Sequence, residues 1–333
     1  MAFSPPTRRE DGQAPHTGGT ESLAADRSTA IEGGLARAGR RRLAKRNRRS
    51  VRRKISKAVA RAIVDSAVTR SGVKLLGRVL PAARVQLTRY EIVLPRLPRH
   101  LDGLRVLHLS DLHLHPGSEL ACQVPELVAN VPHDLTCYTG DFINIDSDIP
   151  GVAELLARMP RAEDVYAVLG NHDYVPFGRD RGTNDVPRLR GVLAGAGLTV
   201  LTNEARPVRG GGLYVVGVDD PATRRDDVAR AMAAVPSDAC ALLLAHSPDV
   251  ALRLGARRPD LILAGHTHGG QIRLPRVGPL MTLSALPGTL AMGLGRYEDV
   301  PLFVSRGIGY STLNLRVGTP PEVALLTLRS GGR

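Results

Sequence analysis

The chain has 333 residues, of which 43% are hydrophobic, and a formal net charge of +13, which is the composition of a globular protein with a basic excess. Twelve lysines and arginines and no acidic residue lie in segment 37–57, so the rest of the chain sums to only 13 − 12 = +1. This distribution argues against a nucleic-acid-binding fold with basic residues spread over its surface, and the lack of an apolar run of about eighteen residues argues against a membrane-spanning helix.

Cysteine usage and the N-terminal region indicate the compartment. Cys122, Cys137 and Cys240 show no paired spacing, and two of them lie in apolar runs typical of buried strands. They predict free thiols in a reducing, cytoplasmic environment. Pairs of arginines are similar to those of a twin-arginine export signal, but Arg61 and Asp65 interrupt the segment where such a signal needs an uncharged apolar run.

The first eighty residues divide into two predicted segments. Residues 1–36 are rich in Gly, Ser, Thr and Pro and predict a disordered tail. Residues 37–80 are basic and then helical, with apolar residues at near-helical spacing. Two interpretations of this second segment stay open: a solvated helix packed on the main domain, or a helix that lies on the anionic inner face of the membrane. Nucleic acid is a third, less favoured partner.

Residues 81–333 predict one α/β domain, because apolar strand patterns alternate with amphipathic helix patterns. The predicted strands are 90–94, 106–109, 135–138, 165–169, 213–216, 241–244, 261–263, 301–305 and 322–328, and the predicted helices are 118–130, 150–158, 186–196 and 224–235. This order indicates two mixed sheets packed together and flanked by helices.

Metal-binding residue types follow five of the predicted strands. In chain order these endings are Ser110-Asp111-Leu112-His113, Gly140-Asp141, Gly170-Asn171-His172-Asp173, His246, and Gly265-His266-Thr267-His268-Gly269-Gly270. One such ending has an ordinary explanation as a solvated turn. Five of them, all at carboxyl ends where open α/β sheets place their chemistry, predict a shared metal centre. Carboxylates and imidazoles without thiolate suit Mn²⁺, Fe or Zn²⁺.

In this order the motifs resemble those of the calcineurin-like metallophosphoesterase superfamily. The run from Gly265 to Pro275 is further similar to a bacterial phosphodiesterase subgroup that includes UDP-2,3-diacylglucosamine hydrolases. The resemblance extends from about Tyr90 to the C-terminus and implies a four-layer α-β-β-α sandwich of the metallo-dependent phosphatase type. It also implies two divalent metal ions, one held by Asp111, His113 and His268, the other by Asn171, His246 and His266, with Asp141 bridging them.

The resemblance implies roles for two further residues. A hydroxide bridging the ions would attack the phosphorus, and His172 would donate a proton to the leaving oxygen. Asp173 would orient the His172 ring. Many relatives have a second Asp three residues after the bridging one, whereas this chain has Asn144 there. We therefore expect changed surroundings of the ligands but no lost metal.

Two features near the predicted centre each have two interpretations. His115 is close enough in sequence to reach a substrate, although a surface position is the simpler interpretation. The loop between Leu274 and Tyr297 is rich in Gly, Pro and Met. It either packs on the domain or forms a lid and acyl-chain wall for an amphiphilic substrate.

The sequence therefore predicts a metal-dependent hydrolase of phosphoesters. Phosphodiesters or diphosphates on a small or lipid-like substrate are favoured over free monoesters. The alternatives are a phosphomonoesterase or protein phosphatase of the same fold, a nuclease using the basic segment, and a metal-bound scaffold without turnover. The complete ligand set argues against the scaffold, and the lack of a dense basic or aromatic strip near the site argues against the nuclease.

Overall fold

The computed structural model describes residues 84–115, 118–176, 182–274, 276, 278–279, 281–311 and 315–331. The predicted tail 1–36 and the basic segment 37–80 lie outside these residues. All three cysteines are free thiols. Within the described ranges, every helix is too short or too polar to cross a lipid bilayer.

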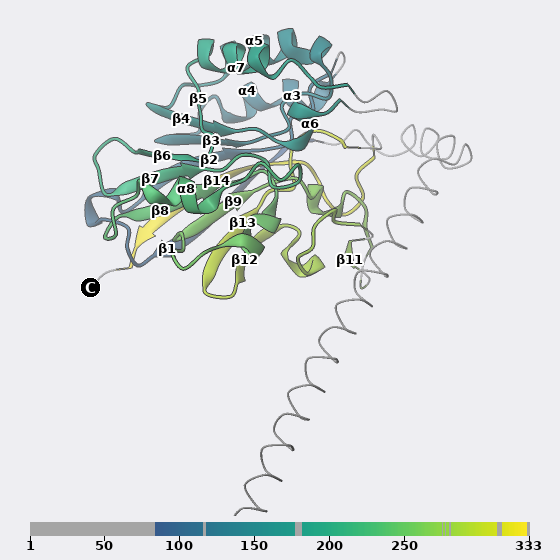
Figure 1. Cartoon of the computed structure of the whole chain (residues 1–333). Helices are drawn as coiled ribbons and strands as arrows, with labels where there is room; N and C mark the ends of the chain where they lie inside the picture. Colours follow the sequence, from purple (N-terminus) through teal and green to yellow (C-terminus); the bar gives the residue numbers. More distant parts are fainter. Residues whose placement is uncertain are drawn as a thin grey trace, which may run out of the picture. The chain divides into compact units, whose positions relative to one another are not determined.

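Two six-stranded mixed sheets form the centre of the domain (Figure 1). The first has the order β1-β14-β2-β3-β4-β5, and only the β14–β2 pair is antiparallel. Its strands are β1 (Gln86–Leu94), β2 (Leu104–Leu109), β3 (Leu135–Thr139), β4 (Asp164–Val168), β5 (Thr199–Val200) and β14 (Glu322–Ser330).

The second sheet has the order β12-β13-β9-β8-β7-β6, and its two outermost pairs are antiparallel. Its strands are β6 (Glu204–Pro207), β7 (Leu213–Gly217), β8 (Cys240–Leu244), β9 (Leu261–Ala264), β12 (Gly293–Tyr297) and β13 (Val300–Val304). A small antiparallel pair, β10 (Arg273–Leu274) and β11 (Gly278–Pro279), follows β9.

Alternating side chains divide the apolar interior into three clusters. Along β2, Val106 packs in the cluster between the two sheets, whereas Leu107 packs on the outer face of the first sheet. In the second sheet, Leu242 faces the first sheet and Leu243 packs in the third cluster, on the outer face. Both faces of the central strands, such as β3, β8 and β9, are therefore buried, which is why these strands appear in the sequence as continuous apolar runs.

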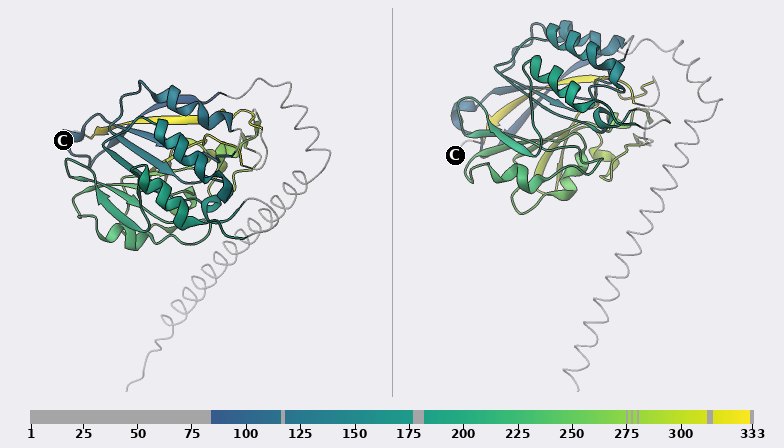
Figure 2. Two further views of the ribbon diagram at one scale, coloured as in Figure 1. Left: turned by 90° about the horizontal axis from the view of Figure 1, so that it is seen from above. Right: turned by 45° about the horizontal axis from the view of Figure 1, so that its top comes forward.

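Helices cover both outer faces. The first sheet is covered by α3 (Glu119–Cys122), α4 (Val124–Val128), α5 (Ile149–Arg158) and α7 (Val186–Gly195). The second is covered by α8 (Val228–Ala233) and the 3₁₀ helix η3 (Pro248–Arg253). Figure 1 shows α5 and α7 on the outer side of the first sheet, and Figure 2 shows the same layers from two other sides. The predicted fold of two mixed sheets flanked by helices is confirmed.

The remaining elements are short. They are α6 (Asn171–Tyr174) and the 3₁₀ helices η1 (Arg99–Leu101), η2 (Asp146–Asp148), η4 (His268–Gly270) and η5 (Gly288–Leu290).

Among the predicted elements, one helix and one loop have a different structure. The predicted helix 118–130 is broken into α3 and α4 around Gln123, because Pro125 has no N–H to donate to the preceding turn. The predicted loop between Leu274 and Tyr297 ends in a strand, since β12 pairs with β13. Its two glycines conceal that strand in the sequence.

Candidate metal centre

The five predicted strand endings meet at one edge of the domain. Strands β2 and β3 are parallel and end side by side, and their pairing continues into the loops, because the backbone N–H of Asp111 donates to the carbonyl of Gly140 at 3.0 Å. The second sheet joins them through His246, whose Nδ1 lies 2.7 Å from the carbonyl oxygen of Thr139. The backbone N–H of His266 donates to the carboxylate of Asp111 at 3.1 Å. Loops from both sheets therefore converge on one point.

Six of the predicted ligands form two adjacent groups. The ligand atoms of Asp111, His113 and His268 lie within 4.8 Å of one another, and so do those of Asp141, His246 and His266. Nε2 of His113 is 3.1 Å from Nε2 of His268, and Nε2 of His246 is 3.1 Å from Nδ1 of His266.

The carboxylate of Asp141, which belongs to the second group, also approaches the first. Its Oδ2 is 3.1 Å from Nε2 of His246 and 3.5 Å from Nε2 of His113. Asp141 is therefore close to imidazoles of both groups.

Burial makes the imidazoles suitable donors of lone pairs. It lowers the pKa of His113 to about 3 and that of His266 to about 4, and it holds the pKa of His268 well below its usual range. These rings are therefore neutral near pH 7, which is the form that binds metal.

His246 differs from the other three histidines. Burial alone would lower the pKa of His246 and raise that of Asp141, but the attraction between the two side chains has the larger effect. The contact raises the pKa of His246 well above its ordinary value and holds that of the Asp141 carboxyl well below its own. Positive charge beside Asp141 is therefore stabilised, whether a proton or a metal ion carries it.

The Nδ1 atoms of His113 and His246 each make a hydrogen bond to an oxygen acceptor. Nδ1 of His113 lies 2.8 Å from Oδ1 of Asn144, and Nδ1 of His246 contacts the Thr139 carbonyl. Both partners can only accept, so each Nδ1 carries a proton. In the neutral ring of His113 this leaves Nε2 to present its lone pair to the centre. Asn144, which departs from the family pattern, thus contacts a predicted ligand directly.

Asn171 and His172 are the first two residues of the short helix α6. Oδ1 of Asn171 is buried and has no hydrogen-bond partner among the described residues, which is costly for an amide oxygen that no ligand satisfies. The His172 ring lies 5.2 Å from that of His113, centre to centre. Its backbone is fixed on both sides: its N–H donates to Asp141, and its carbonyl accepts from Nδ2 of Asn184, each at 2.8 Å.

Asp173 has contacts that the sequence analysis did not predict. Its carboxylate accepts the backbone N–H groups of Asp141, Phe142, Ile143 and Gly170, at 2.8–3.3 Å. It therefore holds the β3 and β4 loops together, and its orientation of the His172 ring stays a prediction.

The backbone at the centre is strained. Asp111, His113, Asp141, His266 and His268 all have positive φ, between 43° and 68°. Non-glycine residues adopt this region rarely, and such residues cluster at functional sites. The strain directs side chains from three tight loops, those after β2, β3 and β9, to one point.

Two glycines permit this close approach. A Cβ at Gly170 would lie 2.7 Å from Nδ1 of His246, and a Cβ at Gly265 would collide with the side chains of Ser110 and Asp111. No larger residue fits at either position without moving a predicted ligand.

The sequence analysis missed two further residues, the buried Asp219 and the half-buried Arg316. Asp219 follows β7, and its Oδ1 accepts from the hydroxyl of Tyr174 at 2.6 Å; the strand-end pattern could have found it. The Arg316 guanidinium lies 3.0 Å from Nδ1 of His268 and donates to the Arg306 carbonyl at 2.7 Å. Burial lowers the pKa of Arg316 to about 10, so it stays charged near neutral pH. No local motif marks this arginine.

The fold and the site define a metal-dependent phosphoester hydrolase, and comparison with known proteins gives its family. The profile of the calcineurin-like phosphoesterases matches residues 104–270. The uncharacterized metallophosphoesterase YkoQ of Bacillus subtilis is 34% identical over 66% of this chain and 82% of its own length.

Two further relatives have named activities. The phosphodiesterase YaeI of Escherichia coli is 29% identical over 72% of this chain and 88% of its own. The UDP-2,3-diacylglucosamine pyrophosphatase LpxG of Chlamydia trachomatis is 26% identical over 73% and 88%. The chain belongs to the calcineurin-like phosphoesterase family, which confirms the resemblance inferred from its motifs.

Proposed function

We propose that the protein hydrolyses phosphodiester or diphosphate bonds with two divalent metal ions. Asp141 carries this proposal, because its carboxylate contacts the imidazoles of both groups. In the proposed assignment Asp111, His113 and His268 hold one ion, Asn171, His246 and His266 hold the other, and Asp141 is shared.

The residues fit such ions by their chemistry. They offer hard oxygen and borderline nitrogen donors without thiolate, a set that suits Mn²⁺, Fe or Zn²⁺. The buried amide oxygen of Asn171 gains the partner it otherwise lacks. When bound, two such ions neutralise phosphate charge and activate water as a nucleophile near neutral pH.

His172 is proposed to protonate the leaving oxygen. Two backbone hydrogen bonds, to Asp141 and from Asn184, fix its place next to His113. A histidine held there can transfer a proton as the ester bond breaks. In this proposal Asp173 acts through the loops whose backbone amides it binds.

The net charge of the metal-loaded site and the names of the relatives support a phosphodiester or diphosphate as the substrate. Four positive charges on the ions against the carboxylates of Asp111 and Asp141 leave an excess of about two, which favours an anionic phosphate. The names of YaeI and LpxG support diesters and diphosphates over monoesters. We therefore propose a small or lipid-like phosphoester as the substrate.

A substrate screen tests this proposal. The manganese-loaded protein would be offered nucleotides, nucleotide sugars, phospholipids, phosphopeptides and short nucleic acids. We expect turnover of diesters or diphosphates, with monoesters and phosphopeptides slower. Preferred cleavage of RNA or DNA would favour a nuclease instead, and bound metal without turnover of any ester would favour a non-catalytic scaffold.

A further inference from the structure

Strand β1 is a long strand at an edge of the first sheet. It has nine residues, and β14 is its only neighbour among the strands that the structure describes. The other strands at the edges of the two sheets are shorter, since β5 has two residues, β6 four and β12 five. Proteins usually keep edge strands short or covered, because their unpaired backbone groups can pair with another chain. The length of β1 therefore favours pairing with a further strand.

The backbone groups of every second β1 residue point away from the sheet. The N–H of Gln86 donates to the carbonyl of Pro321, just before β14, at 2.9 Å. In a parallel pair, one residue turns both its N–H and its C=O to the neighbouring strand, and the next residue turns both to the other side. Gln86 and each second residue after it therefore bond to β14, and the residues between them face the free edge. These outward-facing residues are Leu87, Arg89, Glu91 and Val93.

The side chains of the four outward-facing residues lie on one face of the sheet. Leu87 packs against the apolar cluster on the outer face, and alternation places the other three side chains on the same face. Val93 is 58% exposed, the highest value among the exposed large hydrophobic residues that the structure describes. Arg89 is exposed and forms no ion pair with a described residue, and Glu91 lies 3.3 Å from Nε of Arg329. An apolar side chain and two opposite charges are therefore available to a partner.

The order of these residues makes β1 complementary to a second copy of itself. An antiparallel pair centred on Tyr90 places Arg89 of each strand opposite Glu91 of the other. It places Leu87 opposite Val93 in the same way. The two strands then overlap over their whole length, and their free backbone groups face each other in about eight interchain hydrogen bonds. The Tyr90 ring packs between the two sheets, so it leaves the centre of the pair open.

Charge disfavours the neighbouring registers. Sliding one strand by two residues is the smallest step that keeps the free backbone groups opposite each other. This step brings Arg89 against Arg89 of the other copy, or Glu91 against Glu91. Like charges directly opposite each other are destabilising, whereas opposite charges stabilise a strand pair. The two charged residues therefore select the register that is centred on Tyr90.

We propose that two copies of this chain pair antiparallel through β1, so that their two first sheets become one continuous sheet. Arg89 and Glu91 set the register, and the contact between Leu87 and Val93 covers the exposed apolar side chain. This dimer does not depend on the proposed hydrolysis.

Sedimentation equilibrium of the full chain tests the proposal. An interface formed mainly by one pair of strands is small, and small interfaces are weak, so we expect a reversible equilibrium between monomer and dimer at micromolar concentration. Hydrogen exchange of the outward-facing amides should be slower in the concentrated dimer than in dilute protein, and exchange of the amides that bond to β14 should not change. A monomer at every concentration, or a dimer without this protection in β1, overturns the proposal.

Reversal of the two charges locates the interface. Arg89→Glu leaves only carboxylates at the centre of the pair, and Glu91→Arg leaves only guanidinium groups. Each single variant should therefore dimerise at least about tenfold more weakly than the unaltered chain. The double variant restores both attractive pairs and should dimerise like the unaltered chain. An equimolar mixture of the two single variants should form a mixed dimer.

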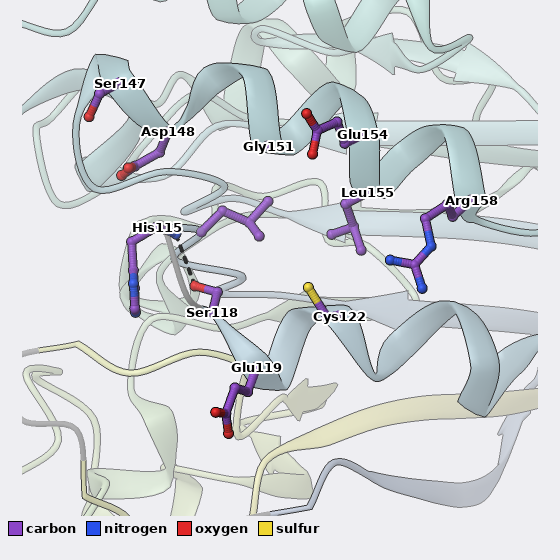
Figure 3. A pocket seen from close by; sticks show the side chains of 11 residues that line it. His115, Ser118, Glu119, Cys122, Ser147, Asp148, Gly151, Glu154, Leu155 and Arg158 are labelled. Carbon is purple, nitrogen blue, oxygen red and sulfur yellow. Dashed lines mark hydrogen bonds between the residues drawn. The ribbon is translucent and has the colours of Figure 1, made fainter.

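Arg158→Glu is the matched control, because it makes the same change of charge outside β1. This exposed arginine lies on α5 and lines a cavity between α3 and α5 (Figure 3). The control should dimerise like the unaltered chain, and thermal unfolding shows whether each variant is folded. A dimer that survives both single reversals, or that Arg158→Glu also disrupts, overturns the proposal. So does a folded double variant that stays monomeric.

Discussion

Asp141 and His172 lie side by side but have different proposed tasks, which metal analysis can separate. Asp141→Asn should abolish activity and weaken the binding of both ions, because this carboxylate contacts both groups. His172→Ala should lower the rate by about 10²–10⁴-fold, the usual contribution of a general acid, and leave both ions bound. Elemental analysis and turnover of both variants check this.

His133→Ala serves as the matched control, since this histidine lies in the loop before β3 and its Nδ1 donates to the carbonyl of Val131. It should retain both ions and the full rate. Loss of an ion from His172→Ala would show that the division into ligands and acid is wrong.

His108 predicts a pH dependence of stability that is independent of the metal ligands. Its ring is fully buried, with Nε2 at 2.9 Å from Oγ1 of Thr139, and burial lowers its pKa to about 3. The unfolded chain, with a pKa near 6.5, binds a proton between these values while the folded chain does not. Stability from this group is therefore full above about pH 6.5 and falls by about 1.4 kcal/mol per pH unit as the pH drops toward 3.

Urea unfolding of the unaltered protein and of His108→Gln, at several pH values between 4 and 7, measures this effect. The stability difference between the two should shrink or reverse as the solution becomes more acidic. A difference that is constant with pH would show that His108 is not held neutral in the folded state.

Residue identities at the centre were predictable from sequence because each proposed ligand belongs to a short local motif at a strand end. The partners of those ligands were not. The four amides bound by Asp173 and the guanidinium next to His268 come together only through long-range packing.

At the scale of elements, strands buried on both faces were found from their apolar runs, such as β8 (Cys240–Leu244). The sequence analysis did not predict three edge strands, which are the short β5 and β6 and the glycine-containing β12. An edge position requires little apolar pattern, so these strands leave a weak signal in the sequence. The helical periodicity of 118–130 gave no sign of the break between α3 and α4, but Pro125 did indicate it.

The close approach of the β2 and β9 loops gives an element-scale prediction. Gly265→Ala places a methyl group against Ser110 and Asp111, so one loop must move and carry proposed ligands with it. We expect reduced metal content and at least tenfold lower activity, with a destabilisation of about 1–3 kcal/mol from overpacking. Metal analysis and thermal unfolding measure the two effects.

Gly191→Ala is the matched control, because a Cβ there meets no atom within 4 Å and the residue lies in α7. It should raise stability by about 0.5–1 kcal/mol and leave metal content unchanged. Equal metal content in both variants would contradict the view that loop spacing sets the geometry of the centre.

At the scale of the whole molecule, the segment 37–80 predicts attachment to anionic membrane without a part in the chemistry. Its twelve cations within residues 37–57 precede a predicted helix with an apolar stripe. Each cation near an acidic lipid surface contributes about 1 kcal/mol, so even a few give strong, salt-sensitive binding. A variant that begins at Pro81 should match the full chain on a soluble phosphodiester but fail to sediment with anionic vesicles.

Vesicles of zwitterionic lipid are the control and should bind neither protein. If the full chain ignores anionic vesicles but binds RNA or DNA tightly in moderate salt, the membrane prediction is wrong and a nuclease gains support.

The central claim is that two metal ions held at the strand ends perform the hydrolysis. The most direct measurement follows metal content and turnover of bis(p-nitrophenyl) phosphate in the same sample, through exhaustive chelation and stepwise return of Mn²⁺. We predict that chelation removes both ions and all activity, and that activity returns as the two sites of each chain fill. Full activity in a sample without residual metal would contradict the account.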